Sequence, residues 1–337
     1  MLSLLRALRA AVLVYAVGAA VLWSQLLRRL RRGFREPALP RQPDRVAIVT
    51  GGTDGIGLAT ARQLARLGMR VVIAGNNTEK AQDVVSSLRA QTGNDKVDFL
   101  FCDLASLTSV RKFVRDFLSQ GYPLHVLVNN AGVMLVPQGT TEDGFENHFG
   151  LNFLGHFLLT NLLLGALRDT GTQECRSRVV TVSSSTHYVG ELDPAHLEGS
   201  LDYSPHAAYA CSKLALVVFS RRLQRLLAAR GDLVTANVAD PGVVDTALFS
   251  HTCWVMQAVQ WALGWLLFKT PDEGAWTTVY AAAAPELEGV GGCYMYNEEA
   301  VEPLRVTWDQ TLQDQLWVES CRLTGILDET GAGLPGP

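Results

Sequence analysis

Short apolar runs alternate with segments of helical spacing between residues 45 and 300. The runs are rich in β-branched residues and end at glycine or polar positions, which is typical of buried strands. We predict strands at 45–50, 71–74, 97–101, 124–128, 179–182 and 234–238, and a last edge strand at 289–296. Strands that alternate with helices in this way predict an α/β fold with a doubly wound parallel sheet.

A further apolar run, residues 10–27, contains no charged residue and is just long enough to span a membrane. Because the heavier positive flank follows the run, we expect the rest of the chain to stay cytosolic. A monotopic anchor in one leaflet is the competing geometry. Secretion after cleavage is the other alternative, but the run ends in leucines and a basic cluster rather than small residues. The flanking arginines are Arg6, Arg9, Arg28, Arg29, Arg31, Arg32 and Arg35.

The pattern divides the chain into four parts. Residues 1–35 form a hydrophobic membrane anchor with its basic flank, and the proline-containing stretch 36–44 is a linker. Residues 45–300 form the α/β domain, and 301–337 form a C-terminal tail. Within the domain, 246–270 is apolar and carries Trp254, Trp261 and Trp265 on one helical face. We expect this segment to be a lid that touches membrane, with ordinary core packing as the alternative.

Charge and cysteine content limit the possible partners. The net charge of the chain is −4, and residues 1–35 carry +7, which leaves −11 for the rest. An acidic body gives no reason to expect a nucleic-acid partner. The six cysteines show neither CxxC nor zinc-ligand spacing. We therefore expect free thiols, a reducing compartment and no metal.

A glycine-rich turn joins the first strand to a helix predicted at 58–67. Its glycines suit a tight turn at Gly51, close backbone approach to a pyrophosphate at Gly55, and close helix packing at Gly57. The helix N-terminus supplies N–H groups and positive potential for phosphate. The strand–turn–helix context predicts dinucleotide binding. The candidate residues are Gly51, Thr53, Asp54, Gly55, Ile56 and Gly57.

Tyr209 and Lys213 stand four residues apart in a predicted helix, so they share one face. A phenol ionises near pH 10, and a nearby ammonium group lowers that pKa. A tyrosine tuned in this way can exchange a proton with an alcohol or carbonyl oxygen. The pair therefore predicts acid–base chemistry on such a group.

The glycine turn, Asn129-Asn130-Ala131-Gly132 and Tyr209-x-x-x-Lys213, in this order, resemble the short-chain dehydrogenase/reductase family over about residues 44–300. The resemblance implies a Rossmann-type fold. It also implies an NAD- or NADP-dependent oxidoreductase that interconverts an alcohol and a carbonyl.

The same resemblance implies further catalytic residues. Ser184 matches the family's donor to the substrate oxygen, with Ser183 and Ser185 as competitors. Asn152 matches the structural and proton-relay asparagine, although it could instead bond its own helix backbone. Lys213 would also hold the nicotinamide ribose.

The cofactor's contacts follow from resemblance too. After the second strand stand Asn76 and Asn77, neither an acid nor an arginine, which predicts relaxed use of both NAD and NADP. Lys80 is a candidate phosphate ligand or a solvated lysine. Asp103 is expected at the adenine, or as an N-cap. The remaining expected contacts, beside ribose and nicotinamide, are Asn130, Ala131, Gly132, Tyr209, Lys213, Pro241, Gly242, Val243 and Thr246.

A narrower resemblance within the family, over 46–57, 74–77, 204–213 and 264–276, concerns the substrate. It implies a long-chain isoprenoid alcohol or aldehyde, with polyprenol oxidised to polyprenal and dolichal reduced to dolichol. Retinol and steroids remain open. The other alternative is a catalytically idle NAD(P)-binding regulatory protein. The expected partners are a membrane lipid surface, at the endoplasmic reticulum or a lipid droplet, and a second copy in a possible homodimer.

Overall fold

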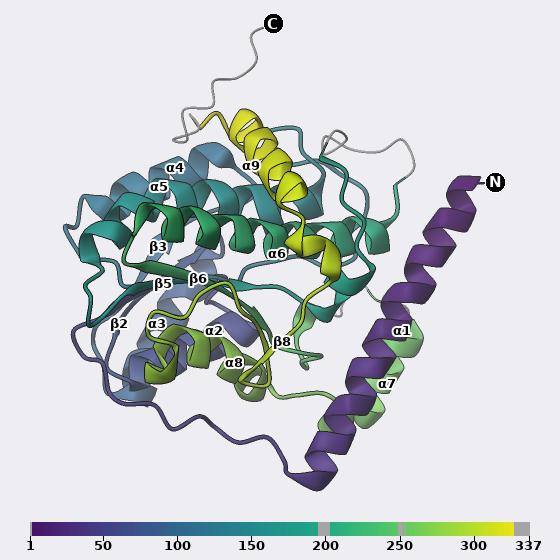
Figure 1. Cartoon of the computed structure of the whole chain (residues 1–337). Helices are drawn as coiled ribbons and strands as arrows, with labels where there is room; N and C mark the ends of the chain where they lie inside the picture. Colours follow the sequence, from purple (N-terminus) through teal and green to yellow (C-terminus); the bar gives the residue numbers. More distant parts are fainter. Residues whose placement is uncertain (1, 195–202, 249–251, 253, 327–337) are drawn as a thin grey trace, which may run out of the picture.

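The computed structural model describes residues 2–194, 203–248, 252 and 254–326, and its centre is a sheet of eight strands (Figure 1). The strand order is β3-β2-β1-β4-β5-β6-β7-β8. All neighbouring strands are parallel except β7 and β8, which are antiparallel. The strands are β1 (Val46–Thr50), β2 (Arg70–Gly75), β3 (Val97–Phe101), β4 (Val126–Asn129), β5 (Ser177–Val182), β6 (Val234–Asp240), β7 (Tyr294–Tyr296) and β8 (Glu299–Val301).

Helices cover both faces of this sheet (Figure 1). One face carries α4 (Leu107–Leu118), the π-helical segment η1 (His148–Leu154), α5 (Gly155–Thr170), α6 (Pro205–Arg230) and α9 (Gln310–Thr324). The other face carries α2 (Gly55–Arg66), α3 (Thr78–Thr92) and α8 (Pro271–Ala283). The remaining elements are α1 (Leu2–Arg31), α7 (Trp254–Leu267) and the short turns η2 (Ser185–Val189), η5 (Pro285–Leu287) and η6 (Arg305–Trp308).

The central strand β1 shows why both faces need helices. Val46 and Ile48 enter the core that contains α4, α5, α6 and α9. Ala47 and Val49 enter the core under α2 and α8. Successive strand residues point to opposite faces, so a strand that is apolar throughout must be covered twice. The predicted α/β fold with a doubly wound parallel sheet is thus confirmed.

The last edge strand is placed differently from the prediction at 289–296. β7 is only three residues long, and β8 forms the true edge beyond it. Asn297 and Glu298 join the two strands, and both have a left-handed backbone, with φ of 52° and 63°. Such a two-residue turn is typical of a tight β-hairpin, and asparagine adopts it readily.

The domain does not end at residue 300, as the sequence division assumed. α9 packs against α6, with Leu316, Trp317 and Cys321 in the main core. The Trp317 ring stacks on Phe219 with centroids 6.0 Å apart. Leu312 and Leu316, like Trp317 and Cys321, stand four residues apart in α9, a helical spacing that the division at residue 300 left unused. Residues 327–337 of the predicted tail lie outside the described residues.

α1 runs along one side of the body and lies beside α7 (Figure 1). α7 falls within the predicted lid segment 246–270, of which 249–251 and 253 lie outside the described residues. Trp254, Trp261 and Trp265 are 79%, 89% and 76% exposed. Core packing, the alternative for these tryptophans, is therefore wrong. Within the described residues, α1 and the η1–α5 segment are long and apolar enough to cross a membrane, and the latter is mostly buried.

Leu316 tests whether α9 belongs to the cooperative fold. Leu316→Ala should lower the free energy of unfolding by about 2–5 kcal/mol, because it leaves a cavity against α6. Val318→Ala, on the exposed side of the same helix, should change it by less than about 0.5 kcal/mol. Urea unfolding of the detergent-solubilised protein measures both. Equal effects of the two variants would mean that α9 is not part of the cooperative unit.

Candidate active site

A cavity of about 330 Å³ opens at the carboxyl ends of β1, β2, β3 and β4. Ligands of open parallel sheets bind at this edge, where the strand order reverses between β1 and β4. Twelve predicted residues line the cavity: Gly51, Thr53, Asp54, Gly55, Ile56, Gly57, Asn76, Asp103, Asn130, Ala131, Gly132 and Thr246. The lining residues that the sequence did not single out are Ala74, Gly75, Cys102, Leu104, Val133, Leu151, Ala247 and Leu248.

The glycines at the mouth of the cavity cannot carry side chains. Gly51 and Gly55 have φ of +66° and +51°, a left-handed backbone that suits glycine. A Cβ on Gly57 would lie 2.2 Å from the carbonyl oxygen of Gly51. The turn thus brings the N-terminus of α2 close to β1 and to the cavity, and Asp54 caps the helix by accepting a hydrogen bond from Gly55 N. This cradle fits a dinucleotide pyrophosphate.

Two asparagines follow β2, and the structure gives them different surroundings. Asn76 lines the cavity. Asn77 is the N-cap of α3, and its side chain accepts a hydrogen bond from Lys80 N. The ammonium group of Lys80 pairs with Asp54 at 3.1 Å, with both side chains more than half exposed. Lys80 therefore lies at the rim of the cavity, and its charge there is matched by a carboxylate.

Asp103 lines the cavity after β3. Its Oδ1 accepts a hydrogen bond from Ala105 N. The N-cap of α4 is Ser106, whose side chain accepts from Ser109 N. The N-cap alternative for Asp103 is thus wrong, and a role at the adenine stays a prediction.

Thr50, which the sequence analysis did not single out, holds the loop after β4. Its hydroxyl accepts hydrogen bonds from the backbone N–H groups of Asn130 and Ala131, at 2.8 and 3.0 Å. The same hydroxyl lies 2.9 Å from His156 Nε2. His156 Nδ1 faces the carbonyl oxygen of Asn152, which can only accept, so Nδ1 carries the proton. Burial lowers the pKa of His156 to about 4 and keeps the ring neutral.

Asn152 sits in η1 and is fully buried. Its side chain accepts from Val133 N and donates to Val133 O and to Ser212 Oγ. It therefore bonds the loop after β4 and the helix α6 rather than its own helix. A Cβ on Gly132 would lie 3.2 Å from Asn152 Oδ1 and 3.7 Å from Lys213 Nζ. The loop, the asparagine and the lysine thus meet at one point.

Three serines end β5, and the structure gives them distinct partners. Ser183 donates to the carbonyl oxygen of Lys213. Ser185 donates to the carboxylate of Asp240. Ser184 is the serine whose side chain interacts with the phenol of Tyr209. This arrangement favours Ser184 over its two neighbours as the group beside the reacting oxygen.

Tyr209 and Lys213 lie on α6 and are both buried, with Lys213 Nζ 5.8 Å from the centroid of the tyrosine ring. Leu248, from the cavity wall, packs beside Tyr209. Lys213 Nζ also donates to the carbonyl oxygen of Val182. Tyr209, Lys213, Ser184 and Asn152 do not themselves line the cavity. The pair lies next to its wall, near Leu248 and Gly132.

Burial dominates the electrostatics of this pair. It raises the pKa of Tyr209, and Asp240 raises it further, while hydrogen bonds with Ser184 and Thr186 act against the rise. Burial lowers the pKa of Lys213 to about 8, and Asp240 opposes that fall. The expectation that Lys213 brings the tyrosine pKa down is therefore not met. A protonated Tyr209 at neutral pH suits proton donation to a carbonyl oxygen.

The loop after β6 is held by the N-terminal helix. Gln25 is buried, accepts from Val243 N at 2.8 Å and donates to Val243 O and Leu267 O. Its Oε1 also occupies the space that a Cβ on Gly242 would need. Thr246 reaches the cavity from this loop, whereas Pro241, Gly242 and Val243 do not line it. Contacts of these three with a cofactor stay a prediction.

A substitution of Asp240 tests whether its carboxylate raises the pKa of Tyr209. Asp240→Asn keeps the shape but removes a negative charge, so the Tyr209 phenolate becomes less costly and its pKa falls. In oxidation the phenolate is the active form, so activity is lost as pH falls through this pKa. The acidic limb of the pH profile for alcohol oxidation should therefore move to lower pH, by up to about one unit. The control is Asp245→Asn, an exposed carboxylate in the same loop. An unchanged profile for Asp240→Asn would contradict the assigned role.

Comparison with known proteins places this site in a family. Residues 45–253 match the family model for short chain dehydrogenase. Polyprenol dehydrogenase from Homo sapiens is 64% identical, covering 98% of this chain and 100% of that protein. Retinol dehydrogenase 13 from Mus musculus is 40% identical, covering 93% of each.

A solved structure agrees. The RhlG/NADP active-site complex of Pseudomonas aeruginosa has a TM-score of 0.61 and 25% identity, and the match covers 76% of this chain and 95% of that one. The chain belongs to the short-chain dehydrogenase family and is an oxidoreductase that uses a nicotinamide cofactor and acts on alcohols.

Proposed function

We propose that this enzyme interconverts an alcohol and a carbonyl at the end of a long-chain isoprenoid lipid. Polyprenol would be oxidised to polyprenal, and dolichal reduced to dolichol, in the synthesis of the dolichol carrier of N-glycosylation. The observation that carries the substrate is the 64% identity to a polyprenol dehydrogenase over nearly the whole chain. The cavity, with the buried Tyr209 close to its wall residue Leu248, supports the chemistry.

We assign the proton transfer to Tyr209. In reduction its phenol donates a proton to the carbonyl oxygen, and in oxidation its phenolate takes the alcohol proton. Ser184, next to that phenol, donates a hydrogen bond to the same oxygen. When bound, the nicotinamide accepts or supplies the hydride.

The other polar groups position this pair. Lys213, which is buried beside Tyr209, holds the nicotinamide ribose. Asn152 fixes the loop after β4 through Val133 and contacts α6 through Ser212. Because Val133 lines the cavity, Asn152 links the cofactor site to the helix that carries Tyr209 and Lys213.

We also propose relaxed cofactor preference. At the rim, Asn76 is neutral and the charges of Lys80 and Asp54 offset each other. An amide can bond ribose hydroxyls without repelling a phosphate. The cofactor contacts remain those named from the sequence, with Asp103 at the adenine and Thr246 at the carboxamide.

We place the enzyme on a membrane of the endoplasmic reticulum or of lipid droplets, with its body in the cytosol. The five cysteines in the described residues are free thiols, which suits a reducing compartment. Gln25 and Arg29 of α1 bond the loops around α7, which argues against removal of the N-terminal segment on secretion.

The first test is hydride transfer by the detergent-solubilised protein, with polyprenol and NAD+, then dolichal and NADPH. Tyr209→Phe should lower kcat by at least about 100-fold, because it removes the proton donor. Tyr122→Phe, before the opposite end of β4, is the matched control. Turnover of all-trans-retinol but not of polyprenoids would refute the substrate. Cofactor binding without any turnover would favour the idle-binder alternative.

Cofactor preference is tested by kcat/KM for NAD+ and NADP+. For the wild type we expect the two values within about tenfold of each other. Asn76→Arg adds a charged donor for the extra phosphate, so it should shift the ratio toward NADP+ by about tenfold or more. Gln91→Arg, at the far end of α3, adds the same charge as a control. A strong wild-type preference for either cofactor would overturn the proposal.

A further inference from the structure

The N-terminal helix α1 is fixed to the body at points spread along its length. Near its C-terminal end, Gln25 bonds the backbone of Val243 and Leu267. Arg29 donates to Phe268 O and pairs with Glu273 at 2.8 Å. These contacts bury the amide of Gln25 in a polar setting that hydrocarbon could not replace.

The opposite end of α1 also contacts the body. The Tyr15 ring packs on His206, with centroids 5.3 Å apart, and Arg9 lies 3.2 Å from Glu191. At 1.5 Å per residue, the contacts from Arg9 to Arg29 span about 30 Å, the thickness of the hydrocarbon core. If α1 crossed a bilayer in this arrangement, the body beside it, with charged groups at both ends, would lie in hydrocarbon.

The side of α1 that faces away from the body is apolar. Six large side chains there are more than half exposed and, at 100° per residue, fall on one stripe: Leu4, Leu5, Leu8, Val12, Trp23 and Leu30. The buried Val14 and Gln25 fall on the opposite side of the helix. The side of α1 that faces the body therefore makes polar contacts, and the side that faces away is apolar.

α7 extends this surface. It lies beside α1 (Figure 1) and is joined to it through Gln25 and the carbonyl oxygen of Leu267. Its exposed Trp254, Trp261 and Trp265 repeat at i, i+7 and i+11. We call the outer stripe of α1 and these three tryptophans the docking face. Tryptophan is the side chain that best suits the headgroup level of a membrane.

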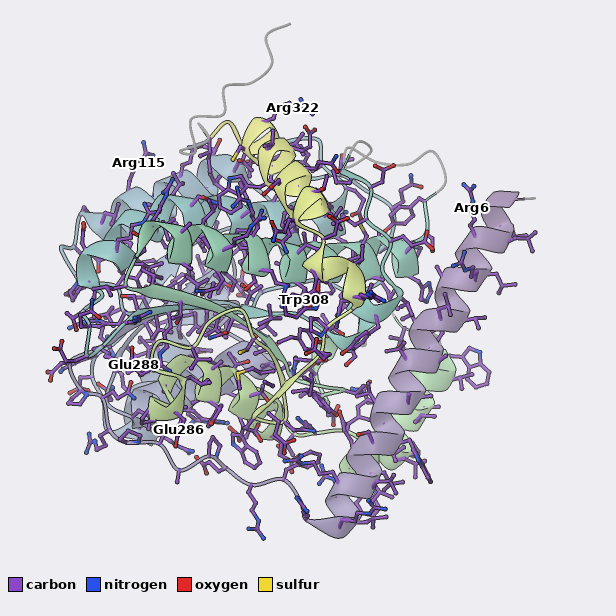
Figure 2. All side chains as sticks on the ribbon, viewed as in Figure 1. Arg6, Arg115, Glu286, Glu288, Trp308 and Arg322 are labelled. Atoms are coloured by element: carbon purple, nitrogen blue, oxygen red, sulfur yellow. The ribbon has the colours of Figure 1, made fainter. Side chains whose placement is uncertain are left out.

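The positive charge of residues 1–35 indicates what binds to the docking face. Residues 1–35 contain seven arginines and no acid, and Arg6 lies near the free end of α1, away from the body (Figure 2). Two such segments would repel each other in a dimer, whereas anionic lipid headgroups would attract them. A lipid surface therefore fits this face better than a second copy of the chain.

We propose that α1 and α7 dock together on a lipid surface, with α1 lying in the plane of one leaflet instead of crossing the bilayer. This inference rests on the membrane attachment proposed above, not on the substrate or the chemistry. It reverses the preference for a spanning helix that length and flanking charge gave. Leu248, at the cavity wall, precedes Trp254 of the docking face by six residues in the chain. A lipid alcohol would then enter from the leaflet.

Membrane topology is the decisive measurement. The full chain carries an epitope and an Asn-Gly-Thr glycosylation acceptor before Met1 and is inserted into microsomes. An in-plane α1 leaves the acceptor unglycosylated and the epitope open to protease in intact vesicles, while the protein stays resistant to carbonate extraction. Glycosylation of the acceptor would overturn the proposal. A signal-anchor protein with the same acceptor is the positive control.

The part played by α7 is measured by flotation with vesicles of phosphatidylcholine and phosphatidylserine. The double variant Trp261→Ser, Trp265→Ser should lower vesicle binding at least tenfold. Trp308→Ser changes an exposed tryptophan of η6, away from α1 and α7, and should leave binding unchanged (Figure 2). Wild-type binding by the double variant, or dimers without vesicle binding, would refute the docking face.

Hydride transfer in detergent is measured for the same proteins, so the two proposals can fail separately. A glycosylated acceptor with normal polyprenol turnover rejects the in-plane helix and keeps the function. An unglycosylated, membrane-bound protein that lacks turnover keeps the helix and rejects the function.

Discussion

The candidate site depends on one constraint, that polar groups buried at the carboxyl edge of the sheet must find partners in each other. Thr50 is fully buried, and its hydroxyl serves the loop after β4 and His156 at the same time. His156 in turn bonds the backbone of Asn152, whose side chain reaches Val133 and Ser212. Loss of any member would leave a buried donor or acceptor unpaired, which is costly. The network therefore joins the cofactor side of the cavity to the helix that carries Tyr209.

The same burial that makes this network strong also sets the chemistry. A dry surrounding raises the pKa of Tyr209 and lowers that of Lys213. Asp240, equally buried and bonded to Tyr294 and the backbone N–H of Gly242, adds a negative charge nearby. A protonated tyrosine can donate a proton to a carbonyl oxygen.

The edge of the sheet formed by β7 and β8 supports the N-terminal helix and the loop after β6. β7 and β8 end the sheet, and α1 lies beyond them, with Arg28 3.8 Å from Glu299 of β8. Through Gln25, α1 also fixes the backbone of Val243, three residues from Thr246 in the cavity wall. An element that sequence patterns assign to the membrane alone is thus part of the framework that holds the loop after β6.

The sequence by itself determined the order of the first six strands and the helices between them, and the cradle of the glycine turn. It also identified twelve of the residues that line the cavity, because hydrophobic periodicity, glycine spacing and the ends of strands are local signals. Tertiary structure alone decided that Ser183 and Ser185 have other partners, that α9 belongs to the core, and that Thr50 and Gln25 hold loops. It also decided the electrostatics of Tyr209, where burial outweighs the lysine one turn away. These outcomes depend on contacts between residues far apart in the chain and on the solvent exposure of those residues. Local sequence spacing determines neither the contacts nor the exposure.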